Sequence, residues 1–350
     1  MSDPCPSSRT TKTSLKYKTS WVANSLSWCG RDDIPFRLVV SSFVQDYLNF
    51  VEIIEKDEND QLICRAMWEH CYPPTKTMFS PKKMANDYII TTADYLRLWE
   101  ITDLPPSEAS DTEKGRTIQS KATVKRVFDN GRPNEVCSPI TSCDWNRDNL
   151  SIVGCCSLDT TVTIWDLESN QQKTKLVAHD KEVYDMAFAV SSSYTFASCG
   201  ADGSVRLFDL RDMDHCTILY ETNGLSPLLR VAWNQQDSNY ISTFGIESAE
   251  AVVVDIRYPS VPASVLSNGH KQPINGMAWS PSSAQNICTV GEDAMACIWD
   301  ANADVSESKY QFTCETPINN VVWRVLGENK MSEENWFGIT TSEGVQLLRF

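Results

Sequence analysis

The stretch GHKQPINGMAWSPSSAQNICTVGEDAMACIWD, residues 269–300, holds three short apolar segments in order. The first, residues 274–279, ends on an aromatic residue, and the last, residues 294–300, ends on an aromatic residue followed by aspartate. An acidic turn at Asp293-Ala294 precedes the last segment. Apolar and polar residues alternate along these segments, as they do along half-buried strands. The stretch therefore predicts consecutive β-strands joined by tight turns.

The same arrangement recurs along the whole chain. First strands that end in an aromatic residue are predicted at residues 22–28, 74–79, 140–145, 183–188, 228–233, 274–279 and 318–323. Their terminal aromatics are separated by 51, 66, 43, 45, 46 and 44 residues. The last four intervals match the period of roughly 40–45 residues that is typical of a four-stranded propeller blade. The sequence thus predicts an all-β fold, a seven-bladed β-propeller with blades that start near residues 22, 74, 139, 182, 227, 273 and 317.

The chain ends indicate how the ring closes. The last predicted strand stops at Phe350 and leaves the seventh blade without its outermost strand. Residues 15–19 are predicted to supply it, since the exchange leaves no blade with a long unpaired edge. Residues 14–350 are expected to form one propeller domain behind a disordered tail, residues 1–13. The acidic residues 103–115 (DLPPSEASDTEKG) are predicted to form a surface loop.

Composition narrows the functional classes. The chain has no run of about 18 apolar residues and begins with a polar segment, so neither membrane insertion nor a secretory signal is expected. Its 13 cysteines form no Cys-x-x-Cys pair, which favours reduced thiols in a cytoplasmic and nuclear protein over a zinc site. A net charge of −15 disfavours direct binding of nucleic acid.

One polar set in the sixth repeat points to a family. His270 lies 19 residues before Thr289 and 23 before Asp293, and Trp299-Asp300 repeats the dipeptide Trp165-Asp166. This dipeptide and spacing resemble the WD-repeat family. The resemblance implies that His270, Thr289, Asp293 and Trp299 form one hydrogen-bonded network within the blade.

The fourth repeat has a shorter version of the same set. His179 lies 19 residues before Ser198 and 23 before Asp202, but Phe208 replaces the Trp. The remaining blades are predicted to lack the histidine. A hydrolase triad would use the same three residue types, but no Gly-x-Ser-x-Gly turn surrounds Ser198. A structural network repeated in two blades is the preferred interpretation, and we expect no enzyme activity and no cofactor.

Three stretches resemble a narrower family: AHDKEVYDMAF at 178–188, GADGSVRLFDLR at 200–211 and PLLRVAWNQQDSNY at 227–240. They are similar to the plant Transparent Testa Glabra and anthocyanin-regulating propellers and to an animal DDB–cullin-associated factor. The resemblance implies a scaffold that joins dual-specificity tyrosine-regulated kinases, helix-loop-helix or Myb-type transcription factors, or cytoskeletal regulators into one complex. The alternative is a substrate receptor of a cullin-RING ubiquitin ligase.

Such receptors carry a Trp-Asp-x-Arg box after a third strand. Here the matching segments contain Asp209 with Arg211 and Asp255 with Arg257, both without the Trp. They are candidates for a cullin-adaptor edge, and the alternative is that each arginine pairs with a nearby carboxylate.

A scaffold also needs a contact face, which we place on the rim where the first strands begin. Alignment on the strand-end aromatics brings several residues to equivalent rim positions, and Arg230 follows one of them. The candidates are Thr141, Glu182, Tyr184, Leu229, Arg230, Asn275 and Asn319. Tyr184, Leu229 and Arg230 are the preferred anchors, because aromatic and arginine side chains dominate interface energetics.

Overall fold

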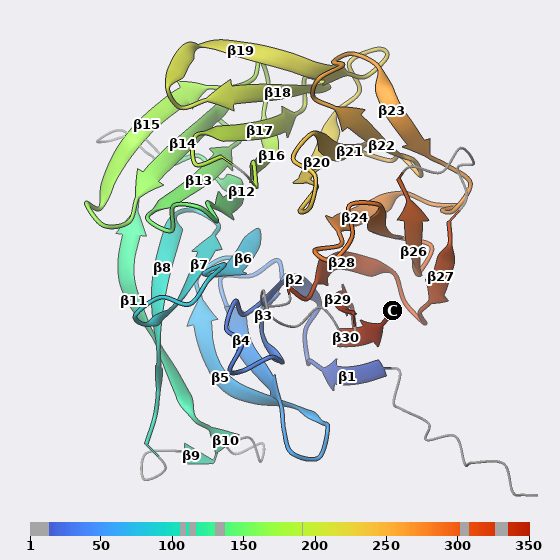
Figure 1. Cartoon of the computed structure of the whole chain (residues 1–350). Coiled ribbons are helices and arrows are strands. Elements are labelled where there is room, and N and C mark those ends of the chain that lie inside the picture. Colours follow the sequence, from blue (N-terminus) through green and yellow to red (C-terminus); the bar gives the residue numbers. More distant parts are fainter. Residues whose placement is uncertain are drawn as a thin grey trace, which may run out of the picture.

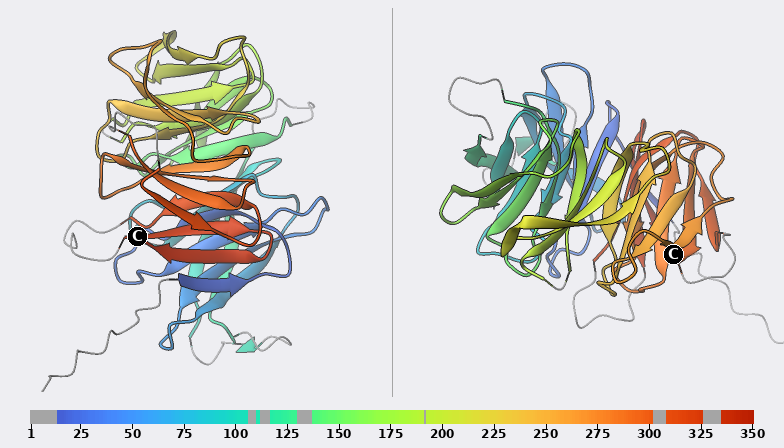
Figure 2. Two further views of the ribbon diagram at one scale, coloured as in Figure 1. Left: turned by 90° about the vertical axis from the view of Figure 1, so that its right-hand side faces the viewer. Right: turned by 90° about the horizontal axis from the view of Figure 1, so that it is seen from above.

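The computed structural model describes residues 14–105, 110–111, 117–129, 137–190, 192–301, 308–325 and 335–350. Within them, seven four-stranded antiparallel sheets stand around a central axis like the blades of a propeller (Figures 1 and 2). The predicted seven-bladed propeller is confirmed. The predicted tail, residues 1–13, lies outside the described residues, as does most of the loop predicted at 103–115.

In the first six blades the strands run in sequence order from the axis outward. The first three blades contain β2 (Ala23–Trp28), β3 (Arg37–Ser42), β4 (Asn49–Lys56) and β5 (Leu62–His70); β6 (Lys76–Phe79), β7 (Asp87–Thr92), β8 (Leu96–Asp103) and β11 (Ser120–Phe128); and β12 (Ile140–Trp145), β13 (Ile152–Ser157), β14 (Thr161–Asp166) and β15 (Gln171–Val177).

The next three blades contain β16 (Val183–Phe188), β17 (Thr195–Gly200), β18 (Ser204–Asp209) and β19 (Asp212–Glu221); β20 (Leu228–Trp233), β21 (Tyr240–Gly245), β22 (Ala251–Asp255) and β23 (Pro262–Leu266); and β24 (Ile274–Trp279), β25 (Asn286–Gly291), β26 (Met295–Asp300) and β27 (Tyr310–Thr313). The seventh blade contains β28 (Ile318–Trp323), β29 (Trp336–Thr341), β30 (Gly344–Arg349) and, as its outermost strand, β1 (Ser14–Lys18).

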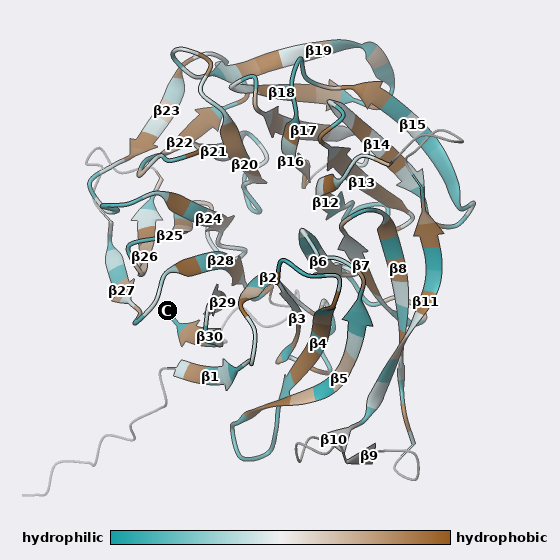
Figure 3. Cartoon of the chain, turned by 180° about the vertical axis from the view of Figure 1, so that it is seen from behind, coloured by the Kyte–Doolittle hydropathy of each residue, from teal (hydrophilic) through white to brown (hydrophobic). Residues whose placement is uncertain are grey.

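The hydrophobic core lies between blades rather than inside them. One cluster of buried side chains fills each of the seven contacts between neighbouring blades. The middle strands β3, β13 and β29 are buried along their whole length, whereas the outer strand β15 is mostly exposed and hydrophilic (Figure 3). Each blade is therefore stabilised only when both of its neighbours are in place.

The N-terminal strand closes the ring. β1 pairs with β30 from Ser14 opposite Leu348 to Lys18 opposite Gly344. Gly344 has φ +133°, and a Cβ there would lie only 2.1 Å from the carbonyl oxygen of Tyr17, so glycine is required at this position. The hydroxyl of Tyr17 also donates a buried hydrogen bond to Glu52 of blade 1 (2.6 Å). Closure by the N-terminal strand, predicted from the chain ends, is confirmed.

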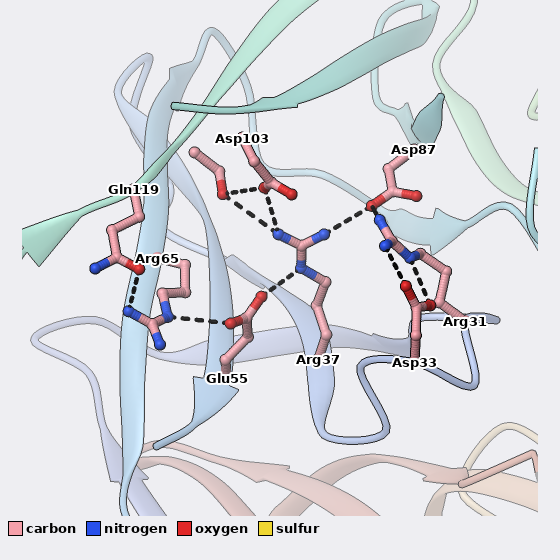
Figure 4. Close-up of polar contacts among 9 residues, drawn as sticks. Arg31, Asp33, Arg37, Glu55, Arg65, Asp87, Asp103 and Gln119 are labelled. Carbon is pink, nitrogen blue, oxygen red and sulfur yellow. Dashed lines mark hydrogen bonds and ion pairs between the residues drawn. The ribbon is translucent and has the colours of Figure 1, made fainter. Parts of the chain in front are cut away.

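An insertion in blade 2 is anchored to blade 1. β8 and β11 extend past the ring, where β9 (Ser110–Asp111) and β10 (Thr117–Ile118) pair beyond β5 (Figure 1). At the base of the insertion the guanidinium of Arg37, 2% exposed, binds Glu55 (2.5 Å), Asp87 (2.7 Å) and Asp103 (2.8 Å), as Figure 4 shows. Asp103, the first residue of the predicted surface loop, is thus the last residue of β8 and a partner in an ion-pair network.

We predict that ring closure depends on β1. A chain that begins at residue 14 should melt like the full chain, whereas one that begins at residue 20 should lose most of its stability. Gly344→Ala should lower the melting temperature in the full chain, because the new Cβ would push β1 away from β30. Differential scanning calorimetry measures all three. Equal melting of the two truncated chains would contradict closure by this strand.

Candidate partner-binding faces and polar networks

The sixth-blade network forms as predicted. Trp299 Nε1 donates to Thr289 Oγ1 (2.7 Å), and His270 contacts Thr289 through Nε2 (2.8 Å) and Asp293 through Nδ1 (3.1 Å). With His270 neutral and protonated on Nδ1, each hydrogen-bond donor of this network meets an acceptor. Gly269 packs under the indole, where a Cβ would lie 2.4 Å from the ring.

The fourth blade replaces the indole with a different set of bonds. His179 contacts Ser198 through Nε2 (2.8 Å) and Asp202 through Nδ1 (3.0 Å). Ser204 Oγ (2.8 Å) and Arg206 Nη2 (3.0 Å) also bind Asp202. Burial alone would raise the pKa of the Asp202 carboxyl, but the bonds and charge from His179 and the bonds from Ser204 hold it well below its usual range.

A third network, in blade 2, corrects the prediction that the remaining blades lack the histidine. Trp99 Nε1 donates to Thr91 Oγ1 (2.9 Å), and His70 Nε2 contacts the same hydroxyl (3.0 Å). His70 Nδ1 meets the carbonyl oxygen of Tyr72 (2.7 Å) in place of an aspartate. Without a carboxylate partner on Nδ1, burial lowers the pKa of His70 to about 4. The spacing rule missed this histidine because it lies 21 residues before its hydroxyl partner rather than 19.

These networks are structural. The Ser198, His179 and Asp202 contacts reproduce the connectivity of a hydrolase triad, but Ser198 is completely buried and His179 is 1% exposed. Thr289 is also fully buried, and its hydroxyl is shared between His270 and Trp299. Neither hydroxyl can reach a substrate, so the two networks stabilise their blades.

The predicted rim residues divide into two groups. Thr141 Oγ1 donates to Val183 O (2.6 Å), Asn275 Nδ2 to Ile318 O (3.0 Å) and Asn319 Nδ2 to Ala23 O (2.8 Å). Each bond joins the first strand of one blade to the first strand of the next. Their shared sequence position reflects this structural role, because a polar side chain there ties neighbouring blades together.

The other rim residues make no such bond to the next blade among the described contacts. Tyr184 is half-buried, and Glu182 is exposed beside it. Leu229 packs partly into the cluster between blades 5 and 6. Arg230 lies in the wall of the central channel, a cavity of about 270 Å³ that also contains Asp144 and Asp185. Tyr184 and Glu182 therefore remain the rim candidates most open to a partner.

The two Asp-x-Arg segments adopt the same geometry in adjacent blades. Arg211 binds Asp209 (2.5 Å) and Arg257 binds Asp255 (2.7 Å), and both arginine side chains are more than half exposed. These bonds lower the pKa of both carboxyls, that of Asp209 to about 2. The Arg211 guanidinium lies over the Tyr194 ring, as Arg257 does over Tyr240 and Tyr258. Each arginine pairs with the aspartate of its own segment.

The two faces of the ring differ in charge. The rim face is the one where first strands begin, and its described loops contain many more carboxylates than cations. The acidic residues of these loops are Asp46, Asp94, Asp129, Asp159, Asp180, Glu182, Asp202, Glu247, Glu250, Glu292, Asp293, Glu315 and Glu343, and their basic residues are Lys181 and Lys271. Three cations on strands also reach this face, because Arg97 pairs with Asp94, Lys175 with Asp159, and Arg206 with Asp180 and Asp202.

The opposite face, where third strands end, holds the two Asp-x-Arg segments and a mixture of both signs. Its basic residues in described loops are Arg31, Lys82, Lys83, Arg147, Arg211, Arg257, Lys309 and Arg324. One face therefore favours basic partners, and the other offers exposed arginines.

Neither a metal centre nor a membrane span is found in the described part of the chain. No group of three or more His, Cys, Asp or Glu residues there could hold a metal ion. No helix there is long and apolar enough to cross a membrane.

Comparison with known proteins places the chain in a family. The WD domain, G-beta repeat model matches residues 133–166, 170–209 and 261–300, which together with the seven blades defines a WD-repeat propeller. The chain is 42% identical, over 95% of its own length and 97% of the relative's, to the DDB1- and CUL4-associated factor 7 homolog of Dictyostelium discoideum. An uncharacterized WD repeat-containing protein of Schizosaccharomyces pombe is 32% identical over 83% of this chain and 70% of its own length. The chain belongs to the family of DDB1- and CUL4-associated factor 7 homologues.

We predict unequal losses when the two histidines with aspartate partners are removed. His270→Ala leaves Asp293 with backbone amide donors alone among the described bonds, which should cost about 1–3 kcal/mol of unfolding free energy. His179→Ala should cost less, because Asp202 keeps the charged Arg206. Urea unfolding of both variants measures the difference, and equal losses would contradict it.

A second prediction concerns pH. In the unfolded chain His70 has its ordinary pKa near 6.5, whereas the folded value is about 4. As pH falls from 6.5 to 4, the histidine binds a proton in the unfolded chain but not in the folded one. The free energy of unfolding therefore falls by up to about 3 kcal/mol over this range. His70→Gln removes this term, and its stability deficit relative to wild type should shrink across that range. A deficit that stays constant from pH 7 to pH 4 would show that His70 is not the buried neutral group described.

Proposed function

We propose that this chain is a non-enzymatic scaffold that tethers a dual-specificity tyrosine-regulated kinase to transcription regulators, of helix-loop-helix or Myb type, or to cytoskeletal regulators. It does so in the cytoplasm and nucleus, without a cofactor. The observation that carries the proposal is the difference between the two faces of one closed ring. An acidic face and an arginine-bearing face can hold two partners at once without overlap.

The rim face is assigned to the regulatory partner. Tyr184 and Glu182 lie at the start of β16, where an aromatic ring beside a carboxylate suits a basic segment. Complementary charge also speeds association and disfavours acidic competitors. The buried His-Ser-Asp set in blade 4 supports a role for this blade as a rigid platform, since its hydroxyl has no access to substrate.

A second candidate function is supported by the opposite face. The name of the Dictyostelium relative describes association with DDB1 and CUL4. Phe208 and Val254, which replace the Trp of the usual box, are both buried, at 5% and 0% exposure. The replacement therefore changes the blade interior and leaves each Asp–Arg pair intact, with its arginine side chain more than half exposed. We include a cullin-ligase adaptor as a candidate partner of this edge.

A pair of double variants tests which face serves which partner. Arg211→Glu with Arg257→Glu should abolish co-purification of DDB1 and leave the kinase or transcription regulator bound. Glu182→Lys with Tyr184→Ala should weaken the regulatory partner by at least about tenfold, the loss expected of a hot spot. Affinity purification followed by quantitative mass spectrometry measures both.

Each double variant is the control for the other, because the substituted side chains are surface or half-buried and lie on opposite faces. Unchanged melting temperatures confirm that both variants fold. If the Glu182→Lys, Tyr184→Ala variant keeps every regulatory partner, the rim assignment is wrong. If no DDB1 co-purifies with the wild type, the ligase candidate fails and the scaffold stands on its rim face alone.

A further inference from the structure

A cluster of exposed apolar side chains marks one corner of the rim face, between blades 1 and 2. It consists of Val22, Phe43, Tyr47, Leu48 and Tyr72, which are 40–77% exposed; we call it the apolar corner. The backbone N–H of Phe43 donates to Val22 O (2.9 Å), and the Tyr47 and Tyr72 rings contact edge to face at 5.7 Å. Grouped exposed apolar residues of this kind are typical of interaction sites rather than of ordinary surface.

The first loop of the corner is held in one conformation by Asn49, which is completely buried. Its Oδ1 accepts bonds from Ser42 Oγ (2.7 Å) and Val44 N (2.9 Å). Its Nδ2 donates to Val44 O (3.0 Å) and Asp46 O (2.9 Å). An amide that makes four bonds fixes the loop of residues 43–48 with its apolar side chains directed outward.

The second loop is fixed by the histidine network of blade 2. His70 Nδ1 binds the carbonyl oxygen of Tyr72 (2.7 Å), and Nε2 binds Thr91 in the next blade (3.0 Å). Two independent buried polar groups therefore hold the two sides of the apolar corner. A preformed surface loses little conformational entropy when a partner binds.

Charge indicates the chemistry of the occupant. Residues 43–48 and 71–75 contain no lysine or arginine, and Lys76, the next residue, is paired with Asp185 (3.6 Å). The exposed Asp46 directly precedes Tyr47, and the exposed Glu69 lies on β5, three residues before Tyr72. Arg97, on the blade 2 side, is already paired with Asp94 (2.6 Å) and is largely buried. The rest of the rim face is acidic, as described above. Acidic lipid headgroups, nucleic acid and a second copy of this acidic chain would all be repelled.

We propose that the apolar corner binds a short segment of a partner protein that combines lysine or arginine with large apolar side chains. The segment would place its apolar side chains against Phe43, Tyr47 and Tyr72, and its cations beside Asp46 and Glu69. This site rests on the proposed scaffold function and gives it a second contact point, separate from Tyr184 and Glu182 in blade 4.

The test uses a phage-displayed library of random twelve-residue peptides selected on the full-length wild-type protein. Enriched peptides are synthesised with fluorescein, and their Kd values are measured by fluorescence anisotropy. The test variant is Phe43→Ser with Tyr47→Ser. The control is Tyr258→Ser, which removes an equally exposed tyrosine (70%, against 77% for Tyr47) from the opposite face. Melting temperatures confirm that both variants fold.

We expect enriched peptides to combine basic and large apolar residues, to bind the test variant at least tenfold more weakly, and to bind the control like the wild type. Binding should also weaken as salt rises. No enrichment, enrichment of acidic peptides, or equal binding to the test variant would overturn the proposal. Two further measurements could assign the apolar corner to another occupant. If the protein sediments with phosphatidylserine vesicles, or forms a dimer in analytical ultracentrifugation, and this depends on Phe43 and Tyr47, the proposal is also overturned. These outcomes are distinct from failure of the proposed scaffold function. That failure would appear in the affinity purification, where the Glu182→Lys, Tyr184→Ala variant would keep every regulatory partner.

Discussion

The pairing of β1 with β30 is the contact on which the rest of the structure depends. Every apolar cluster is shared by two blades, so each blade is incomplete without both neighbours. β1 is hydrogen-bonded to β30 in the last blade and continues along the chain into the first blade, and Gly344 gives it the close approach that this pairing needs. The hydrogen bonds from Asn319 and Thr340 to the backbone of β2 act at the same junction (2.8 Å each). These contacts close the ring between blades 7 and 1.

Closure also separates the surface into two faces with different chemistry. Because strands alternate in direction within each blade, all loops before first strands gather on one face and all loops after third strands on the other. The first face is acidic and contains the apolar corner, and the second contains both Asp-x-Arg pairs. A scaffold that must hold unlike partners gains from this separation, since each partner meets a complementary charge. The buried histidine networks of blades 2, 4 and 6 keep the loops of the first face in place.

The repeat made most of the fold predictable. Strand-end aromatics located the first strands to within two residues, and the unpaired end of the seventh blade identified the closing strand. Spacing also located the networks of His179 and His270, but it missed His70, whose Nδ1 partner is a carbonyl that no sequence pattern reveals. Arg37 was missed because its carboxylate partners are scattered over three strands. Thr141, Asn275 and Asn319 were interpreted as rim contacts, although their equivalent positions arise from bonds between blades.

The central claim is that the two faces serve different partners, and cross-linking mass spectrometry of the complex purified from cells tests it most directly. Among the described loop residues, the rim face has only Lys181 and Lys271, whereas Lys82, Lys83 and Lys309 lie on the opposite face. An amine-reactive cross-linker should join the kinase or transcription regulator to Lys181 or Lys271. Any ligase adaptor that co-purifies should join to lysines of the opposite face. Cross-links from the regulatory partner to Lys82, Lys83 or Lys309, with none to Lys181 or Lys271, would contradict the account.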